Sequence, residues 1–296
     1  MFLARNLDYE HIETTQRQRN FNKNWTFSLN QKDFEKVELP HDWSIYFDFN
    51  HHSPAQNEAA LLDGGKGVYR KIFTIDKKLK DKKILLYFEG VYMDTTIYVN
   101  GHYIGHYPNG YMPFYFYIDE YLYDDCPNRL EVHVNHQQPS SRWYSGSGIY
   151  RDVSLFVLDK HHFLPHRTHL DYNFQTKTLR FKTETSQTVD RFQIQAYTNQ
   201  KEHLGTFHFE EKQKEVFLPD IKPWDLKTPH LYTFEITAYR NDKACDHIVI
   251  KTGFKEMDWK AETGFFLNGE NIPLKGDFNL KDVSFALIPL AALIIF

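Results

Sequence analysis

The chain has 296 residues and a formal net charge of −4, from 35 Lys and Arg against 39 Asp and Glu. This near-neutral balance, without a long basic run, argues against binding to nucleic acid or to an anionic membrane. Aromatic residues make up 17% of the chain, which favours strands, because flat rings pack well on a pleated surface.

Strand patterns follow one another through the first half of the chain. Residues 84–88 form a short apolar run, and residues 96–99 lead into Asn100-Gly101, a dipeptide typical of tight hairpins. Residues 130–134 alternate between apolar and polar side chains, which predicts one dry and one wet face, and residues 153–157 repeat this pattern. Met112 is expected to fill a gap in the core. Residues 1–158 therefore read as one β-sandwich domain.

A second series of strands begins after a His-rich segment that contains Pro165. Residues 179–181, 192–196 and 232–238 have strand patterns, and their spacing suits an immunoglobulin-like sandwich over residues 159–256. Residues 257–296 form a third segment, with a hairpin predicted around Asn268-Gly269 and strands at 265–267 and 272–276. Its apolar end, Phe285 to Phe296, is shorter than the about 20 residues that a membrane span needs, so we expect no membrane association.

Cysteines and histidines give no sign of a cofactor. Cys126 and Cys245 cannot form a disulfide framework, and the first 18 residues lack the apolar core of a signal peptide. We therefore expect a cytoplasmic protein. The adjacent pairs His51-His52 and His161-His162 would point to opposite faces of a strand, so we assign no metal site and no cofactor.

Six short motifs, in one order, carry a family resemblance: Leu39–Trp43 (LPHDW), Gly67–Phe73 (GVYRKIF), Phe88–Gly101 (ending VNG), Arg142–Arg151 (RWYSGSGIYR), Lys222–Tyr232 (with Trp224 and Tyr232) and Gly264–Gly276. Together they resemble family 2 glycoside hydrolases over roughly residues 20 to 276. The form RWYSGSGIYR is similar to that of bacterial β-galactosidases, although β-glucuronidases and β-mannosidases share the architecture. The resemblance implies a jelly-roll sugar-binding domain, an immunoglobulin-like sandwich with Trp224 and Tyr232 in its core, and the truncated start of a TIM barrel.

The catalytic residues of the family lie beyond these domains. Retaining glycosidases use two carboxylates about 5–5.5 Å apart, which in this family are glutamates on a barrel of about 250 residues. Only residues 257–296 follow the second sandwich, so we assign no catalytic residue and expect the chain to be inactive alone. Glu58, Glu89 and Glu131 are interpreted as solvated or packing carboxylates. After Gly276 the resemblance ends, which favours the hypothesis of a frameshift or early stop before residues 277–296.

Two loops of the first domain are candidates for sugar contact. The resemblance places residues 48–66 near the galactosyl unit, and Asn50, Asn57 and Asp63 are the polar side chains there that suit hydroxyl groups. Arg142 and Trp143 lie on the closing loop, where Trp143 would stack on a sugar. The alternative for the first loop is a polar surface loop. For the second, Trp143 would pack between strands while Arg142 pairs with an acid.

Three functions remain open from the sequence. The first is the non-catalytic N-terminal portion of a family 2 β-galactosidase, whose parent activity is retaining hydrolysis of terminal β-galactosides. The second is a carbohydrate-binding module, whose affinity for a β-galactoside would be weak because a few hydrogen bonds barely offset the cost of association. The third is an accessory chain that associates with a separate barrel-bearing subunit, or with itself through the apolar tail.

Overall fold

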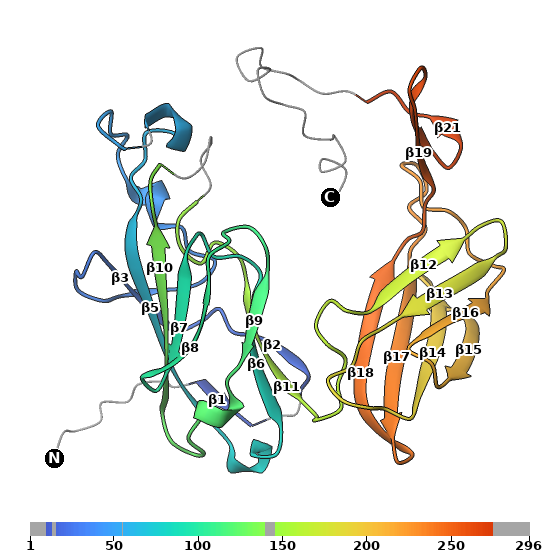
Figure 1. The fold of residues 1–296 in the computed structure, drawn as a ribbon, viewed down its shortest axis with the longest axis horizontal. Coiled ribbons are helices and arrows are strands. Elements are labelled where there is room, and N and C mark those ends of the chain that lie inside the picture. The colour runs from blue at the N-terminus through green and yellow to red at the C-terminus, as the bar shows by residue number, and fades with distance from the viewer. Residues whose placement is uncertain (1–9, 14–15, 55, 140–145, 275–296) are drawn as a thin grey trace. The chain divides into compact units, whose positions relative to one another are not determined.

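The computed structural model describes residues 10–13, 16–54, 56–139 and 146–274, with the side chains of residues 57 and 58 left out. The described residues fall into two compact units. The first comprises residues up to 162 together with 185–189 and 240–246, and the second comprises 163–184, 190–239 and the residues from 247 onward. Nearly all regular elements in the described ranges are strands (Figure 1), so the prediction of an all-β chain is confirmed.

The larger sheet of the first unit is antiparallel along its main path. Its order is β4 (Glu35–Val37), β3 (Trp25–Leu29), β5 (Gly65–Ile75), β10 (Asn128–His136), β7 (Thr95–Val99) and β8 (His102–Tyr107). The short β1 (Glu10–Ile12) adds to this sheet by pairing in parallel with β5. The centre of the sheet therefore joins distant parts of the chain, since β10 lies between β5 and β7.

The smaller sheet of the first unit has the order β2 (Gln18–Asn20), β11 (Val153–Leu158), β6 (Lys83–Phe88) and β9 (Phe114–Tyr117). The connections include four short 3₁₀ helices: η1 (Trp43–Tyr46), η2 (Gln56–Ala59), η3 (Lys77–Leu79) and η4 (Asp119–Tyr121).

Alternating side chains of the two sheets form the core of the first unit. In β10, Leu130, Val132 and Val134 are buried while His133 is exposed, as the sequence pattern predicts. The same prediction for residues 153–157 is wrong, because every residue of β11 is buried. Phe156 belongs to a second apolar cluster with residues of β6, which lies on the face that was expected to be wet.

The turn between β7 and β8 is built as its sequence indicates. Asn100 has φ 52° and Gly101 has φ 84°, the left-handed backbone that a two-residue hairpin turn requires. The Asn100 side chain donates to Tyr121 O and Asn128 Oδ1, both at 2.8 Å. Asn100 is therefore a turn residue that also anchors neighbouring segments.

The second unit is a sandwich of two antiparallel sheets. One has the order β12 (His169–Asn173), β13 (Thr178–Lys182) and β16 (Gln213–Phe217), and the other β15 (His203–Phe209), β14 (Arg191–Thr198), β17 (Tyr232–Arg240) and β18 (Lys243–Thr252). Phe181 of β13 contacts Phe192 of β14 with ring centroids 5.6 Å apart, and both are fully buried. Tyr232 is buried as expected, but Trp224 lies in a loop and is only half-buried, against Lys255.

The last described segment forms a small sheet of β19 (Met257–Lys260), β20 (Gly264–Leu267) and β21 (Glu270–Asn271). The Asn268-Gly269 hairpin is confirmed, but its second strand is Glu270–Asn271 instead of the predicted 272–276. The apolar tail after residue 276 lies outside the described residues, and the assignment of this segment to a barrel stays a prediction.

Candidate functional site

The structure brings together Asn50 and Asp63, two of the predicted sugar-contact residues. Asn50 Nδ2 donates to Asp63 Oδ2 at 3.0 Å, and Asn50 Oδ1 accepts from the backbone N–H of His52 at 2.9 Å. The backbone N–H of Asn50 also donates to Leu61 O at 2.8 Å, which closes the loop between them. Both side chains are half-buried. These bonds explain Asn50 structurally and leave the Asp63 carboxylate with further capacity to accept hydrogen bonds.

The other predicted contacts are less completely described. Asn57 lies in η2, within the same loop, but its side chain is outside the described part. Arg142 and Trp143 lie wholly outside the described residues. Their contacts with sugar stay predictions.

A hydrogen-bond network that the sequence analysis missed joins the LPHDW motif to the RWYSGSGIYR motif. Asp42 Oδ1 accepts from the backbone N–H groups of Ser44 at 3.0 Å and Ser147 at 2.9 Å, so this side chain caps η1 and holds the closing loop. Ser147 Oγ contacts Ser44 Oγ and lies 2.6 Å from His136 Nδ1. The sequence signal that would have found this role is an Asp directly before a short helical turn, which is a typical capping residue.

Burial beside this network favours the uncharged forms of three ring side chains. His41 Nδ1 lies 2.8 Å from the Tyr69 hydroxyl. Burial raises the pKa of Tyr69 well above its ordinary value and lowers the pKa values of His41 and His136. Gly148 has φ +102°, and a Cβ there would collide with the Tyr69 hydroxyl. Glycine is therefore needed in the SGSG segment for this close approach.

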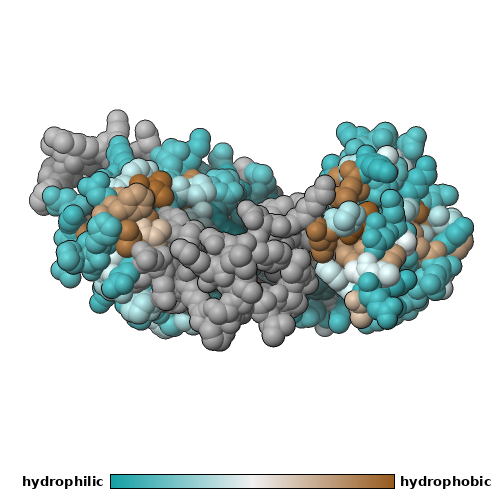
Figure 2. Space-filling view, turned by 90° about the horizontal axis from the view of Figure 1, so that it is seen from above, coloured by the Kyte–Doolittle hydropathy of each residue, from teal (hydrophilic) through white to brown (hydrophobic). Residues whose placement is uncertain are grey.

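Large side chains beside η1 remain exposed. Tyr46 is 75% exposed and Phe49 72%, and the Tyr46 ring stacks on His41 with centroids 6.2 Å apart. Figure 2 shows hydrophobic surface on the first unit amid hydrophilic surroundings. The Tyr46 ring, held by stacking and open to solvent, suits the apolar face of a sugar.

The expectation that Met112 fills a core gap is wrong. Met112 is 58% exposed and lies in a turn that Asn109 holds through its side chain.

Glu131 has a structural partner. Its carboxylate is 2.6 Å from Arg70 Nε, and its side chain is 12% exposed. The interpretation of Glu131 as a packing carboxylate is therefore supported. Among the described residues, no group of three or more His, Cys, Asp or Glu is arranged to hold a metal, and no helix is long and apolar enough to cross a membrane.

Two family models match most of the chain. Residues 18–159 match the sugar-binding domain of glycosyl hydrolases family 2, and residues 165–255 match a further domain of glycosyl hydrolases family 2. The chain belongs to glycosyl hydrolase family 2. The network around Asp42 and the loop closed by Asn50 and Asp63 thus lie in the family's sugar-binding domain.

Relatives agree on the family and differ in substrate. A β-galactosidase of Bacteroides ovatus is 32% identical over 286 residues, which cover 86% of this chain and 34% of that protein. A putative β-glucuronidase of Formosa agariphila is also 32% identical, covering 90% of this chain and 27% of its own length. A solved β-glycosidase from Bacteroides vulgatus superposes with a TM-score of 0.76 at 29% identity, over 88% of this chain and 36% of its own. The chain thus spans about a third of such relatives.

Proposed function

We propose that this chain supplies the two N-terminal, non-catalytic units of a cytoplasmic family 2 β-galactosidase. The parent activity is retaining hydrolysis of terminal β-galactosides, and the chain by itself is inactive. The end of the first unit that carries η1 then forms one edge of the sugar site. The observation that carries this proposal is the Asp42 bond to Ser147, which fixes the exposed Tyr46 segment and the closing loop to each other.

The choice of a galactoside rests on the RWYSGSGIYR motif and on relatives that bear the name β-galactosidase. In this role Asp63 accepts a hydrogen bond from a sugar hydroxyl, and Tyr46 packs on the apolar face of the ring. Cys126 and Cys245 are not joined in a disulfide, which fits a reducing compartment.

The test is hydrolysis of chromogenic β-galactoside and β-glucuronide by the purified chain. The Bacteroides ovatus β-galactosidase serves as the positive control for the galactoside. We expect no turnover by the chain. Turnover of either substrate that follows the chain through purification, and is lost when the chain is removed by a tag antibody, would contradict the assignment as non-catalytic.

A second candidate is an accessory chain for a separate barrel-bearing subunit. It is favoured by Met257 and Trp259 of β19, which are 55% and 52% exposed in the described structure. We expect Trp259→Ala to weaken capture of a tagged barrel segment from the Bacteroides ovatus relative, whereas Val249→Ala, an equally exposed apolar residue on β18, should not. No capture by the unaltered chain would remove this candidate.

A further inference from the structure

The outer face of the sheet β12–β13–β16 carries an ordered array of polar side chains. Leu179 and Phe181 of β13 point inward and are fully buried, so Thr178 and Arg180 point outward. Arg180 pairs directly with Asp171 of β12 on one side and with Glu215 of β16 on the other. Directly paired residues share a face, so these three side chains form one row across the sheet.

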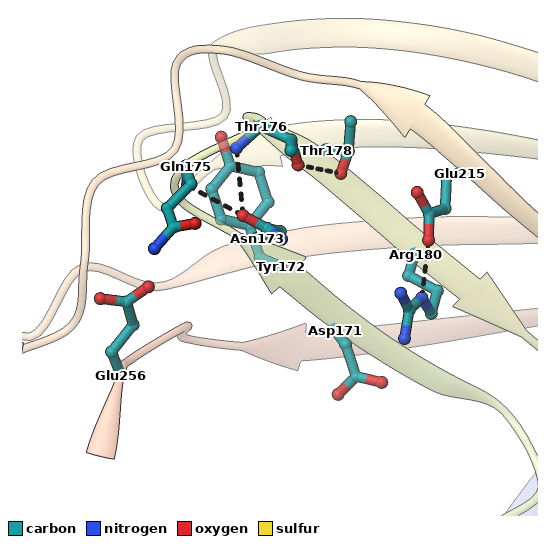
Figure 3. Close-up of a pocket in the computed structure, with 9 residues that line it drawn as sticks. All are labelled: Asp171, Tyr172, Asn173, Gln175, Thr176, Thr178, Arg180, Glu215 and Glu256. Atoms are coloured by element: carbon teal, nitrogen blue, oxygen red, sulfur yellow. Dashed lines mark hydrogen bonds and ion pairs between the residues drawn. The ribbon is translucent and has the colours of Figure 1, made fainter. Parts of the chain in front are cut away.

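A groove of about 390 Å³ lies over this face, with a volume in the range of small-molecule sites. Figure 3 shows the turn residue Gln175 near Glu256 at one end and the Arg180–Glu215 pair at the other. The turn is held in place because Asn173 Oδ1 accepts from the backbone N–H groups of Gln175 at 2.9 Å and Thr176 at 3.0 Å. The lining is therefore ordered before any ligand arrives.

The groove retains hydrogen-bonding capacity for a ligand. Arg180 uses its Nε to donate to Glu215 at 2.8 Å, while a guanidinium has five donors in all. Within the described part of the chain, the carboxylates of Asp171 and Glu256 accept no hydrogen bond. Planar carboxylate, amide and guanidinium groups on one surface match the closely spaced hydroxyls of a sugar.

An exposed aromatic side chain lies on the same face. Phe217 pairs directly with Thr178, which lines the groove, so its side chain projects from the groove's face of the sheet. It is 64% exposed and contributes no ring to the core. A solvent-exposed ring next to polar side chains provides the apolar contact that a pyranose offers through its C–H groups.

We propose that this face is a second carbohydrate-binding site, separate from the sugar-binding domain, which takes neutral pyranosides. Three carboxylates, those of Asp171, Glu215 and Glu256, face the groove against the single guanidinium of Arg180. A uronic acid would bring a fourth carboxylate into this groove, and the three carboxylates already there would repel it. The site therefore holds neutral sugars and discriminates against uronides.

The experiment is a ¹⁵N NMR titration of the full chain with lactose, with dissociation constants on the order of 1 mM expected for so open a groove. We expect amide shifts on β12, β13 and β16. Phe217→Ala and Asp171→Ala should each raise the dissociation constant for lactose at least about fivefold, because each removes one ligand contact. Both residues are exposed, so the fold is preserved, and Val249→Ala on β18 is the matched control.

Charge selection is tested with methyl β-glucoside against methyl β-glucuronide, which differ at a single carbon. The glucuronide should bind at least about fivefold more weakly, and equal or tighter binding would overturn the assignment to neutral sugars. Absent shifts on β12, β13 and β16, or unchanged binding by Phe217→Ala, would overturn the site itself. Shifts confined to the first unit would also overturn this site, but they would leave the proposed function intact. The two failures are therefore distinguishable.

Discussion

The carboxylate of Asp42 accepts a hydrogen bond from the backbone N–H of Ser147 at 2.9 Å, across 105 positions of the sequence. The same carboxylate caps η1 through Ser44. One side chain therefore fixes the relative position of two motifs by which the family resemblance is recognised.

Replacing Asp42 should release both of these backbone donors at once. We expect Asp42→Ala to lower the free energy of unfolding by about 2 kcal/mol, since a lost cap and an unpaired buried N–H add together. Asp42→Asn keeps an acceptor oxygen and should lose less. The measurement is urea denaturation, with the exposed Asp48→Ala as control. Equal stability of Asp42→Ala and Asp48→Ala would show that the network contributes nothing.

The Asn100 turn allows backbone conformation to be separated from side-chain hydrogen bonds. Asn100→Gly keeps a residue that tolerates φ 52° but loses the bonds to Tyr121 O, Asn128 and the backbone N–H of Arg129. Asn100→Ala loses these bonds and adds strain. We expect a destabilisation of about 1–2 kcal/mol for Gly and about 1 kcal/mol more for Ala, by denaturant titration. If Asn100→Gly is as stable as the wild type, the backbone conformation of the turn alone accounts for the asparagine at this position.

Sequence patterns correctly predicted the features that depend only on the local backbone. The alternation in residues 130–134 and the two Asn-Gly hairpins are confirmed because each depends on neighbours in sequence. The second buried face of β11 was missed, because Phe156 packs beside Leu85 and Tyr87, about 70 residues earlier, in a strand whose register no periodicity reveals. The pairing of Asn50 with Asp63 was within reach since both lie in one loop. The contact of Asp42 with Ser147 was not, because only the closed sandwich brings them together.

The buried Lys71 depends on its partner Glu10. Lys71 is 1% exposed, its Nζ is 2.8 Å from Glu10 Oε2, and burial lowers its pKa. Glu10→Gln leaves a buried cation without its counter-charge and should cost about 3 kcal/mol of unfolding free energy. Adding Lys71→Met in the double variant should recover most of that loss, because an apolar chain of similar length fits the space beside Phe21.

The exposed pair Lys78–Asp76 provides the comparison for this experiment. Its lysine side chain is 56% exposed, so Lys78→Met should change stability by less than about 0.5 kcal/mol in the same denaturation assay. A loss in Glu10→Gln no larger than in Lys78→Met would refute the dependence of the core on this ion pair.

The buried His136 should make the first unit less stable in acid. Burial lowers its pKa from 6.5, so below about pH 6.5 the unfolded chain binds a proton that the folded chain does not. The unfolding free energy therefore falls as the pH drops from about 6.5 to the folded pKa, and this contribution is fully retained above about pH 6.5. His41, His133 and His162 have pKa values lowered in the same direction and contribute to the same slope.

His136→Asn isolates the contribution of this one histidine. The amide can still contact Ser147 Oγ, as His136 Nδ1 does at 2.6 Å, but it does not titrate. The loss of unfolding free energy between about pH 7.5 and about pH 5.5 should then be smaller in the variant than in the wild type, by up to about 1 kcal/mol. The exposed Gln200→Asn, which exchanges one non-titrating side chain for another, should keep the wild-type loss. If His136→Asn and wild type lose the same amount, His136 takes up its proton in the folded state as readily as in the unfolded state, and burial does not hold it neutral.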